Sequence, residues 1–132
     1  MLPFYTGSTG NTPKAEFSNT TGVFELTGIS NPENVSLFYN QIIDWLKEFE
    51  QLCTSTGKWP DNGITVNFNL TYCNSASSKY LYKVLEIIKA WVKVGVTLVV
   101  NWYYDESDDK MLDDGQDIAE ALDYEFNYIP LS

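Results

Sequence analysis

The sequence predicts one α/β domain with a mixed sheet of four to five strands and helices mainly on one face of that sheet. Segments whose side chains alternate between apolar and polar are interleaved with segments whose apolar side chains recur every three or four residues. Strands and helices that alternate along a chain are typical of α/β units with crossover connections. The strand-like segments are apolar on one side only, whereas strands covered on both faces are apolar throughout. We therefore expect the helices to crowd one face and to leave the other face open.

The first segments predict an arm followed by two strands. Residues 1–12 are rich in Gly, Ser, Thr and Asn, which is typical of a flexible N-terminal arm, so the folded domain is expected to span residues 13–132. Alternating side chains in residues 13–27 predict two short strands around a turn at residues 18–22.

A long amphipathic helix is expected next. Asn31 is the expected N-cap, and Pro32 suits the first helical position. Over the following turns the apolar side chains form one stripe at spacings of three and four, made of Val35, Phe38, Ile42, Trp45, Phe49 and Leu52. The Gly- and Pro-containing residues 54–63 then end the helix.

Strict alternation in residues 64–72 predicts a strand with one apolar and one polar face. The expected inward side chains are Ile64, Val66, Phe68, Leu70 and Tyr72. The open face would carry Thr65, Asn67, Asn69 and Thr71, together with Asn101 of the next strand. Asparagine is disfavoured in strands, so its repetition here calls for an explanation. We favour a solvated face, because one-sided sheets are common, and keep a partner-binding face as the alternative.

The second half of the chain predicts two more helices and two more strands. Residues 77–95 have helical spacing, with Gly95 as a suitable stop and an inward stripe of Leu81, Val84, Leu85, Ile88, Trp91 and Val92. Residues 96–104 predict a strand, residues 105–122 a helix with an acidic start, and residues 126–131 a short last strand.

The composition excludes several classes of function. The chain has no histidine and no arginine, and its formal net charge is -10. Without histidine the commonest general base and metal ligand is missing, and the separated Cys53 and Cys73 predict free thiols, not a zinc site. The negative charge opposes binding to nucleic acid and to anionic membranes. We expect a partner of other proteins that needs no cofactor or metal, and not an enzyme.

Two further features bear on location and on metals. No apolar run is long enough to span a membrane and the first residues do not resemble a secretory signal, so we expect a cytoplasmic protein. The acidic residues 105–109 lack the spacing of a calcium-binding loop. We interpret them as the first turn of a helix, where the helix dipole favours negative charge.

Three serines, Ser75, Ser77 and Ser78, lie where the central strand is expected to pass into the following helix. Free backbone N–H groups and the helix dipole favour an anion at such a position, so a phosphoserine at Ser75 would be tolerated. Lys79 lies one turn further on and could pair with the phosphate. The alternative is a simple helix cap made by Asn74 or by one of the serines.

Three stretches carry a family resemblance: GISNPENVSLFYNQIIDWL, YCNSASSKYL and NWYYDESDDKMLDDGQD. Together they resemble the SiaC family, small bacterial regulatory phosphoproteins of a biofilm-controlling partner-switch pathway, from about Pro13 to the C-terminus. In that family the residue after Tyr-x-Asn is typically a threonine and is the phosphorylation site. The matching residue here is Ser75, with Ser77 and Ser78 as alternatives, and Ala76 departs from the usual hydroxyl residue.

The resemblance implies a STAS-like fold, similar to that of anti-sigma-factor antagonists, and a non-enzymatic switch. A dedicated serine/threonine kinase would phosphorylate the protein and a PP2C-type phosphatase would restore it. The unmodified form would bind and activate a diguanylate cyclase in cyclic di-GMP signalling. Two alternatives stay open: a protein-binding α/β domain that is never phosphorylated, and a small enzyme that uses Asp105, Asp108 and Asp109.

Overall fold

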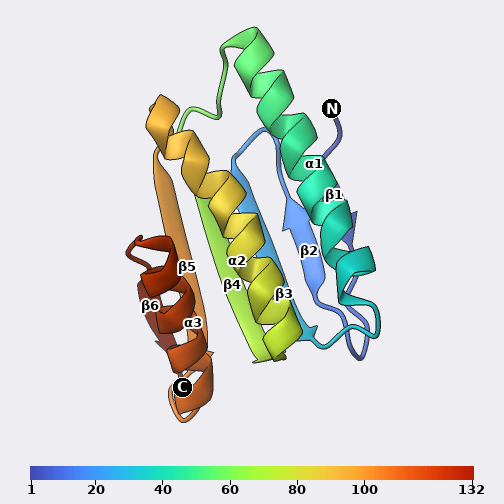
Figure 1. The fold of residues 1–132 in the computed structure, drawn as a ribbon, viewed down its shortest axis with the longest axis vertical. Coiled ribbons are helices and arrows are strands. Elements are labelled where there is room, and N and C mark those ends of the chain that lie inside the picture. Colours follow the sequence, from blue (N-terminus) through green and yellow to red (C-terminus); the bar gives the residue numbers. More distant parts are fainter.

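The computed structural model describes residues 1–132 and contains a six-stranded sheet, three α-helices and one short 3-10 helix (Figure 1). The strands are β1 (Phe4–Thr6), β2 (Lys14–Phe17), β3 (Val23–Ser30), β4 (Ile64–Cys73), β5 (Leu98–Asp105) and β6 (Asn127–Leu131). The helices are α1 (Val35–Thr56), α2 (Ser75–Ala90), the 3-10 helix η1 (Trp91–Val94) and α3 (Asp109–Leu122).

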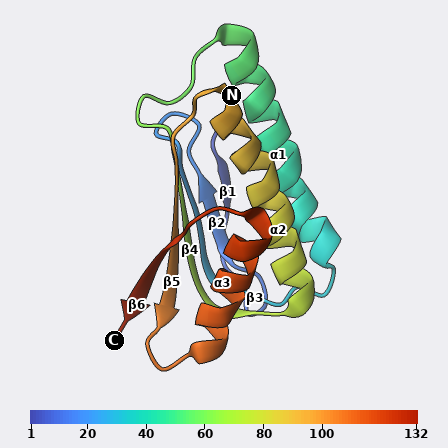
Figure 2. The ribbon, with the colours of Figure 1, turned by 60° about the vertical axis from the view of Figure 1, so that its left-hand side comes forward.

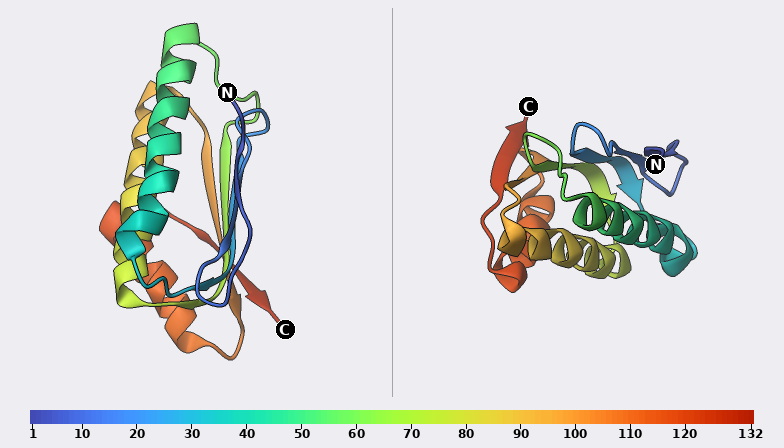
Figure 3. Two further views of the ribbon diagram at one scale, coloured as in Figure 1. Left: turned by 90° about the vertical axis from the view of Figure 1, so that its right-hand side faces the viewer. Right: turned by 90° about the horizontal axis from the view of Figure 1, so that it is seen from above.

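The sheet is mixed, and its strands lie side by side in chain order from β1 to β6. β2 pairs antiparallel with both β1 and β3, whereas the pairs β3–β4, β4–β5 and β5–β6 are parallel. A helix joins each parallel pair, and all three helices lie on one face of the sheet (Figure 3). The prediction of a single α/β domain whose sheet has one helix-covered and one open face is therefore confirmed.

The expected number of four to five strands is wrong, because β1 adds a sixth. This strand lies inside the segment for which only an arm was expected. Phe4 pairs with Phe17 of β2, and their rings contact edge to face with centroids 6.1 Å apart. The Trp45 indole on α1 donates a hydrogen bond to the carbonyl oxygen of Leu2 at 3.0 Å. These partners are distant in sequence, so the composition of the first residues does not reveal the strand.

The core lies between the sheet and the helices and consists of 29 buried residues. The alternation of β4 directs Ile64, Val66, Phe68 and Leu70 into this core, as predicted. Removal of their apolar surface from water, at roughly 25 cal/mol per Å², is the main force that holds the helices against the sheet.

A β-bulge changes the direction of the last side chains of β4. Gly28 pairs with Leu70 and Ile29 pairs with Tyr72, so Thr71 is an extra residue without a partner on β3. An extra residue shifts the alternation by one, and Tyr72 is 46% exposed whereas Cys73 is 1% exposed. The expectation that Tyr72 faces the core is therefore wrong, and Cys73 takes the inward position.

The start of α1 also differs from the prediction. Asn34, not Asn31, is the N-cap, and its side-chain oxygen accepts a hydrogen bond from the Leu37 N–H at 3.1 Å. At the C-terminal end of α1 the apolar stripe closes with Cys53, which is buried, and not with Leu52, which is exposed. Cys53 lies four residues, about one helical turn, after the buried Phe49 and so faces the core with it. No helix of the protein combines the length and the apolar character that a bilayer span requires.

Candidate functional site at the carboxyl edge of the parallel strands

Each α-helix begins shortly after a parallel strand ends, so the N-termini of α1, α2 and α3 gather at one edge of the sheet (Figure 2). We call this the carboxyl edge and define it by residues 30–34, 73–79 and 105–110. A helix N-terminus carries roughly half a positive elementary charge and unpaired N–H groups. Open α/β sheets often bind ligands outside the carboxyl ends of their strands where the strand order reverses, but the strands of this sheet follow chain order without a reversal.

Ser75 is the first residue of α2 and is exposed at the carboxyl edge. No side-chain hydrogen bond engages its hydroxyl, and the neighbouring Ala76 is exposed as well. The prediction that the serine cluster lies at a strand-to-helix junction is correct. Ser75 is therefore open to a modifying enzyme.

Asn74 caps the helix, so no serine is needed for that task. Its side-chain oxygen accepts a hydrogen bond from the Ser77 N–H at 2.8 Å. Its amide group donates to the Asn31 side chain at 2.8 Å, and its backbone N–H donates to the carbonyl oxygen of Ser30 at 3.1 Å. Asn74 thus ties the start of α2 to the end of β3.

Ser77 is completely buried and belongs to a chain of three hydroxyl groups. The Ser30 hydroxyl donates to the Ser77 oxygen at 2.8 Å, and the Ser77 hydroxyl donates to the Ser30 carbonyl oxygen at 3.2 Å. Since Ser30 has only one hydroxyl proton, Tyr39 of α1 donates in the 2.5 Å contact between its hydroxyl and Ser30. The three hydroxyls satisfy one another and hold β3, α1 and α2 together.

Ser78 is half-buried, and its hydroxyl lies 3.4 Å from the Cys73 sulfur. Burial raises the pKa of the Cys73 thiol above its ordinary value, although the hydrogen bond with Ser78 works in the opposite direction. The thiol is therefore protonated at neutral pH. Both cysteines are free in the structure.

Two lysines lie near this site. Lys79 is exposed and forms no salt bridge, so its side chain is available to a phosphate one turn away. Lys110 of α3 pairs with Asp114 at 2.9 Å, and this hydrogen bond raises the pKa of the lysine. Besides burial and the Ser78 hydrogen bond, the charge of Asp114 raises the pKa of Cys73 and the charge of Lys110 lowers it, and helix α3 packs against α2. Sequence reasoning did not find Lys110, because only the fold brings α3 next to the start of α2.

The acidic residues between the end of β5 and the start of α3 mainly form hydrogen bonds with the local backbone. Asp108 is the N-cap of α3 and accepts a hydrogen bond from the Met111 N–H at 3.0 Å. Asp105 accepts from the hydroxyl of Ser107 at 2.5 Å and from its N–H at 2.9 Å, and these bonds lower the pKa of its carboxyl. A general acid would need a raised pKa, so Asp105 is poorly suited to that role in a carboxylate enzyme. No group of three or more potential ligand side chains is arranged for a metal ion.

The asparagines on the open face hydrogen-bond one another. Asn67, Asn101 and Asn127 lie in register on β4, β5 and β6. The Asn101 amide donates to Asn67 at 2.8 Å, and the Asn127 amide donates to Asn101 at 3.0 Å. Thr65 and Asn69 lie on the same face beside this ladder, whereas Thr71 belongs to the bulge. The ladder explains why asparagine is tolerated in these strands, and it leaves both interpretations of the face open.

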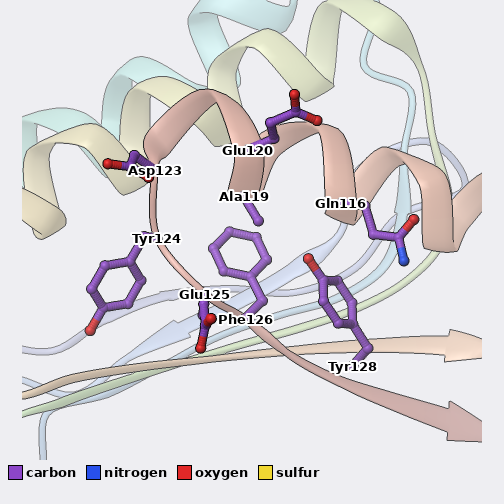
Figure 4. A pocket seen from close by; sticks show the side chains of 8 residues that line it. All are labelled: Gln116, Ala119, Glu120, Asp123, Tyr124, Glu125, Phe126 and Tyr128. Carbon is purple, nitrogen blue, oxygen red and sulfur yellow. The ribbon is translucent and has the colours of Figure 1, made fainter.

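The cavity in Figure 4 lies between the last turns of α3 and β6 and has a volume of about 480 Å³. The aromatic rings of Phe126 and Tyr128 point toward the helix, and burial raises the pKa of Tyr128. None of the predicted site residues lines it, because α3 runs from the carboxyl edge toward the opposite edge. It holds no set of converging catalytic groups.

Comparison with known proteins gives a consistent assignment. The family model described as SiaC family regulatory phosphoprotein matches residues 6–131. A protein of Pseudomonas aeruginosa strain UCBPP-PA14 is 23% identical over 126 residues, which cover 96% of this chain and 94% of the relative.

Two solved structures from Pseudomonas aeruginosa share the fold. The crystal structure of apo-SiaC has a TM-score of 0.82 at 21% identity, over 98% of this chain and 99% of that one. SiaC in complex with diguanylate cyclase SiaD, of which it is the activator, has a TM-score of 0.80 at 21% identity, over 97% and 99% of the chains. A family described as regulatory agrees with the expectation of a protein that is not an enzyme. The resemblance seen in the sequence is confirmed: this chain belongs to the SiaC family of regulatory phosphoproteins.

Proposed function

We propose that this protein is a signalling switch whose unmodified form binds and activates a diguanylate cyclase. Phosphorylation of Ser75 by a serine/threonine kinase releases the cyclase, and a PP2C-type phosphatase restores the active form. Membership of the SiaC family and the complex of the related SiaC with its cyclase support the cyclase as partner. The switch would act in the cytoplasm, where ATP for the kinase is available.

The observation that carries this proposal is the difference between the three serines. Ser75 is exposed and its hydroxyl is unengaged, whereas Ser77 is buried in the hydroxyl chain and Ser78 is half-buried against Cys73. A kinase must reach the hydroxyl oxygen and place it against the γ-phosphate of ATP. Ser75 meets this requirement without loss of any contact in the fold.

The start of α2 can accept a phosphate at Ser75. The Ser77 N–H is bonded to the Asn74 side chain and the Ser78 N–H to the Asn74 carbonyl oxygen. Helix geometry leaves the N–H groups of Ser75 and Ala76 without intrahelical acceptors. These two donors, the helix dipole and the free Lys79 side chain all favour the negative group.

The phosphate would act on the partner and not on the fold. It adds a charge of about -1.5 to -2 and three acceptor oxygens at pH 7. A partner surface shaped for a neutral hydroxyl must desolvate this charge, which can cost several kcal/mol. Since each 1.4 kcal/mol is about tenfold in affinity, this effect is sufficient to dissociate a micromolar complex.

The test compares binding of unmodified and kinase-treated protein to the purified diguanylate cyclase of the same genome by calorimetry. Ser75→Ala should bind like the unmodified protein and resist inactivation by the kinase. Ser75→Asp should bind more weakly and melt within a few degrees of the unmodified protein, because the helix dipole tolerates its charge. Ser78→Ala is the matched control and should still be inactivated by the kinase.

Equal affinities of the phosphorylated and unmodified forms would contradict the switch. Intact-mass analysis of protein from its native cell locates the modification. Cyclase binding without any phosphate would favour the alternative of a binding domain that is never phosphorylated.

A further inference from the structure

Large apolar side chains are exposed on the open face of the sheet near the carboxyl edge. Ile29 of β3 and Tyr72 of β4 are register partners and are 37% and 46% exposed. Both point away from the helices, because their neighbours Ser30 and Cys73 are buried on the helix side. On β6, Leu131 is 39% exposed and shares the outward direction of Asn127 in the ladder.

The half-buried Tyr103 and Ile129 extend this surface, since they pair with each other on β5 and β6 and also face outward. We define the outer patch as Ile29, Tyr72, Tyr103, Ile129 and Leu131. An exposed tyrosine beside aliphatic residues is typical of the centre of a protein interface, where aromatic residues contribute most of the binding free energy.

The bulge at Thr71 is the reason that Tyr72 belongs to this patch. In a regular strand Tyr72 would continue the inward series from Ile64 to Leu70 and would be buried. The single extra residue turns the tyrosine outward and turns the small Cys73 inward. Bulges that re-aim a side chain are concentrated near functional sites.

We infer that the outer patch is the docking surface for the diguanylate cyclase, through an apolar segment of the cyclase that is bordered by lysine or arginine side chains. This inference rests on the proposed function and adds the surface and the chemistry of the partner. The outer patch carries no charge, so the partner segment that covers it must be apolar. The charged residues around the patch determine which charge the partner carries at the edge of that segment.

A groove of about 590 Å³ adjoins the patch at Leu131, and its lining includes Asp105, Asp108 and Asp109. Lys110, the one cationic residue of α3, is already paired with Asp114. The whole chain carries a net charge of -10, so a basic border on the partner gives electrostatic complementarity at the groove.

The outer patch and Ser75 fit into one interface. Tyr72 and Ser75 are three residues apart, so their Cα atoms are separated by at most about 11 Å. An interface of standard size buries about 800 Å² on each partner and is about 30 Å across, so it would cover both positions. The basic border would lie over the groove beside α3, whereas a phosphate at Ser75 would face another part of the partner at the start of α2.

The test is calorimetric binding of purified variants to the full-length diguanylate cyclase of the same genome. Tyr72→Ala should raise Kd about tenfold or more, as expected for an aromatic residue at the centre of an interface. Ile29→Thr, which keeps a β-branched residue in the strand, should raise Kd in the same direction. Tyr5→Ala is the matched control, because Tyr5 is an exposed residue of the same type on β1 and should change Kd less than about twofold.

Thermal unfolding confirms that each variant is folded before its Kd is compared. Unchanged Kd for Tyr72→Ala and Ile29→Thr, with the wild-type protein binding normally, would overturn the inference and leave the proposed function intact. A wild-type protein that neither binds nor activates the cyclase would instead refute the proposed function. Loss of self-association in Tyr72→Ala with no effect on cyclase binding would assign the patch to a second copy of this chain and would also overturn the inference.

Discussion

Ser75 and Ser77 are two residues apart, carry the same hydroxyl group and have different surroundings. Ser77→Ala removes the acceptor of the buried Ser30 hydroxyl. A buried donor without a partner costs about 1–3 kcal/mol, so the free energy of unfolding should fall by about that amount. Ser75→Ala removes an exposed hydroxyl and should change it by less than about 0.5 kcal/mol.

Urea denaturation of the two variants measures the difference directly. Tyr39→Phe tests the same hydroxyl chain, because it removes the hydroxyl that donates to Ser30. The free energy of unfolding should fall by about 0.5–1.5 kcal/mol. A Ser77→Ala variant as stable as Ser75→Ala would show that the hydroxyl chain contributes nothing to stability.

The buried Cys73 makes stability depend on alkaline pH. Burial raises the pKa of this thiol above its ordinary value of 9.0. In the unfolded chain the thiol loses its proton from about pH 9, whereas in the folded protein it stays protonated to higher pH. The unfolded state then binds fewer protons, so the free energy of unfolding is fully present below pH 9 and decreases as the pH rises toward the folded pKa.

Denaturation curves at pH 7 and at pH 10 measure this dependence. Cys73→Ala should be less stable than the wild type at pH 7, because it loses packing in the core, and should lose less stability between the two pH values. Tyr39, whose pKa burial also raises, contributes a loss of the same sign and is present in both proteins. Identical losses in Cys73→Ala and the wild type would contradict the assignment to this thiol.

At the scale of the elements, the start of α2 depends on one residue. Asn74→Ala removes the helix cap and the side-chain bond to Asn31, so the free energy of unfolding should fall by about 1–2 kcal/mol. Asn31→Ala is the matched control, since it removes only the bond between the two side chains and should cost about half as much. Equal losses from both substitutions, measured by urea denaturation, would mean that the cap itself is worth little.

The elements also show where sequence reasoning succeeds and where it stops. The alternation from Ile64 to Leu70 predicts the covered and open faces correctly, because side-chain direction in a strand is a local property. The outward turn of Tyr72 depends on how β4 pairs with β3, and β1 depends on Phe17. Neither partner is visible in the segment itself.

Part of the candidate site is likewise predictable from the sequence, and part is not. The position of Ser75 at a helix start follows from the local sequence, which left the cap open between Asn74 and one of the serines, and the structure selects Asn74. The hydroxyl chain of Ser30, Tyr39 and Ser77 joins β3, α1 and α2. These contacts are products of tertiary packing, so no pattern within one segment could predict them.

At the scale of the whole molecule, charge acts on folding and on binding in opposite directions. A net charge of -10 repels itself in the compact state, and salt screens this repulsion. Raising sodium chloride from about 20 mM to about 300 mM shortens the Debye length from roughly 20 Å to below 10 Å, so the melting temperature should rise by a few degrees. The two salt bridges, Lys14–Glu16 and Lys110–Asp114, have exposed lysines and offer little opposing loss.

The same increase in salt should slow association with the cyclase, if its docking segment carries a basic border. Screening weakens attraction between the acidic groove and that border, and electrostatic steering affects the association rate more than the dissociation rate. Surface plasmon resonance over this salt range should therefore show an association rate that falls by several-fold while the dissociation rate changes less. Asp109→Asn, which removes one exposed carboxylate beside the groove, should flatten the dependence on salt. If the melting temperature rises with salt but the association rate does not change, the chain repels itself as described and the partner surface is not basic.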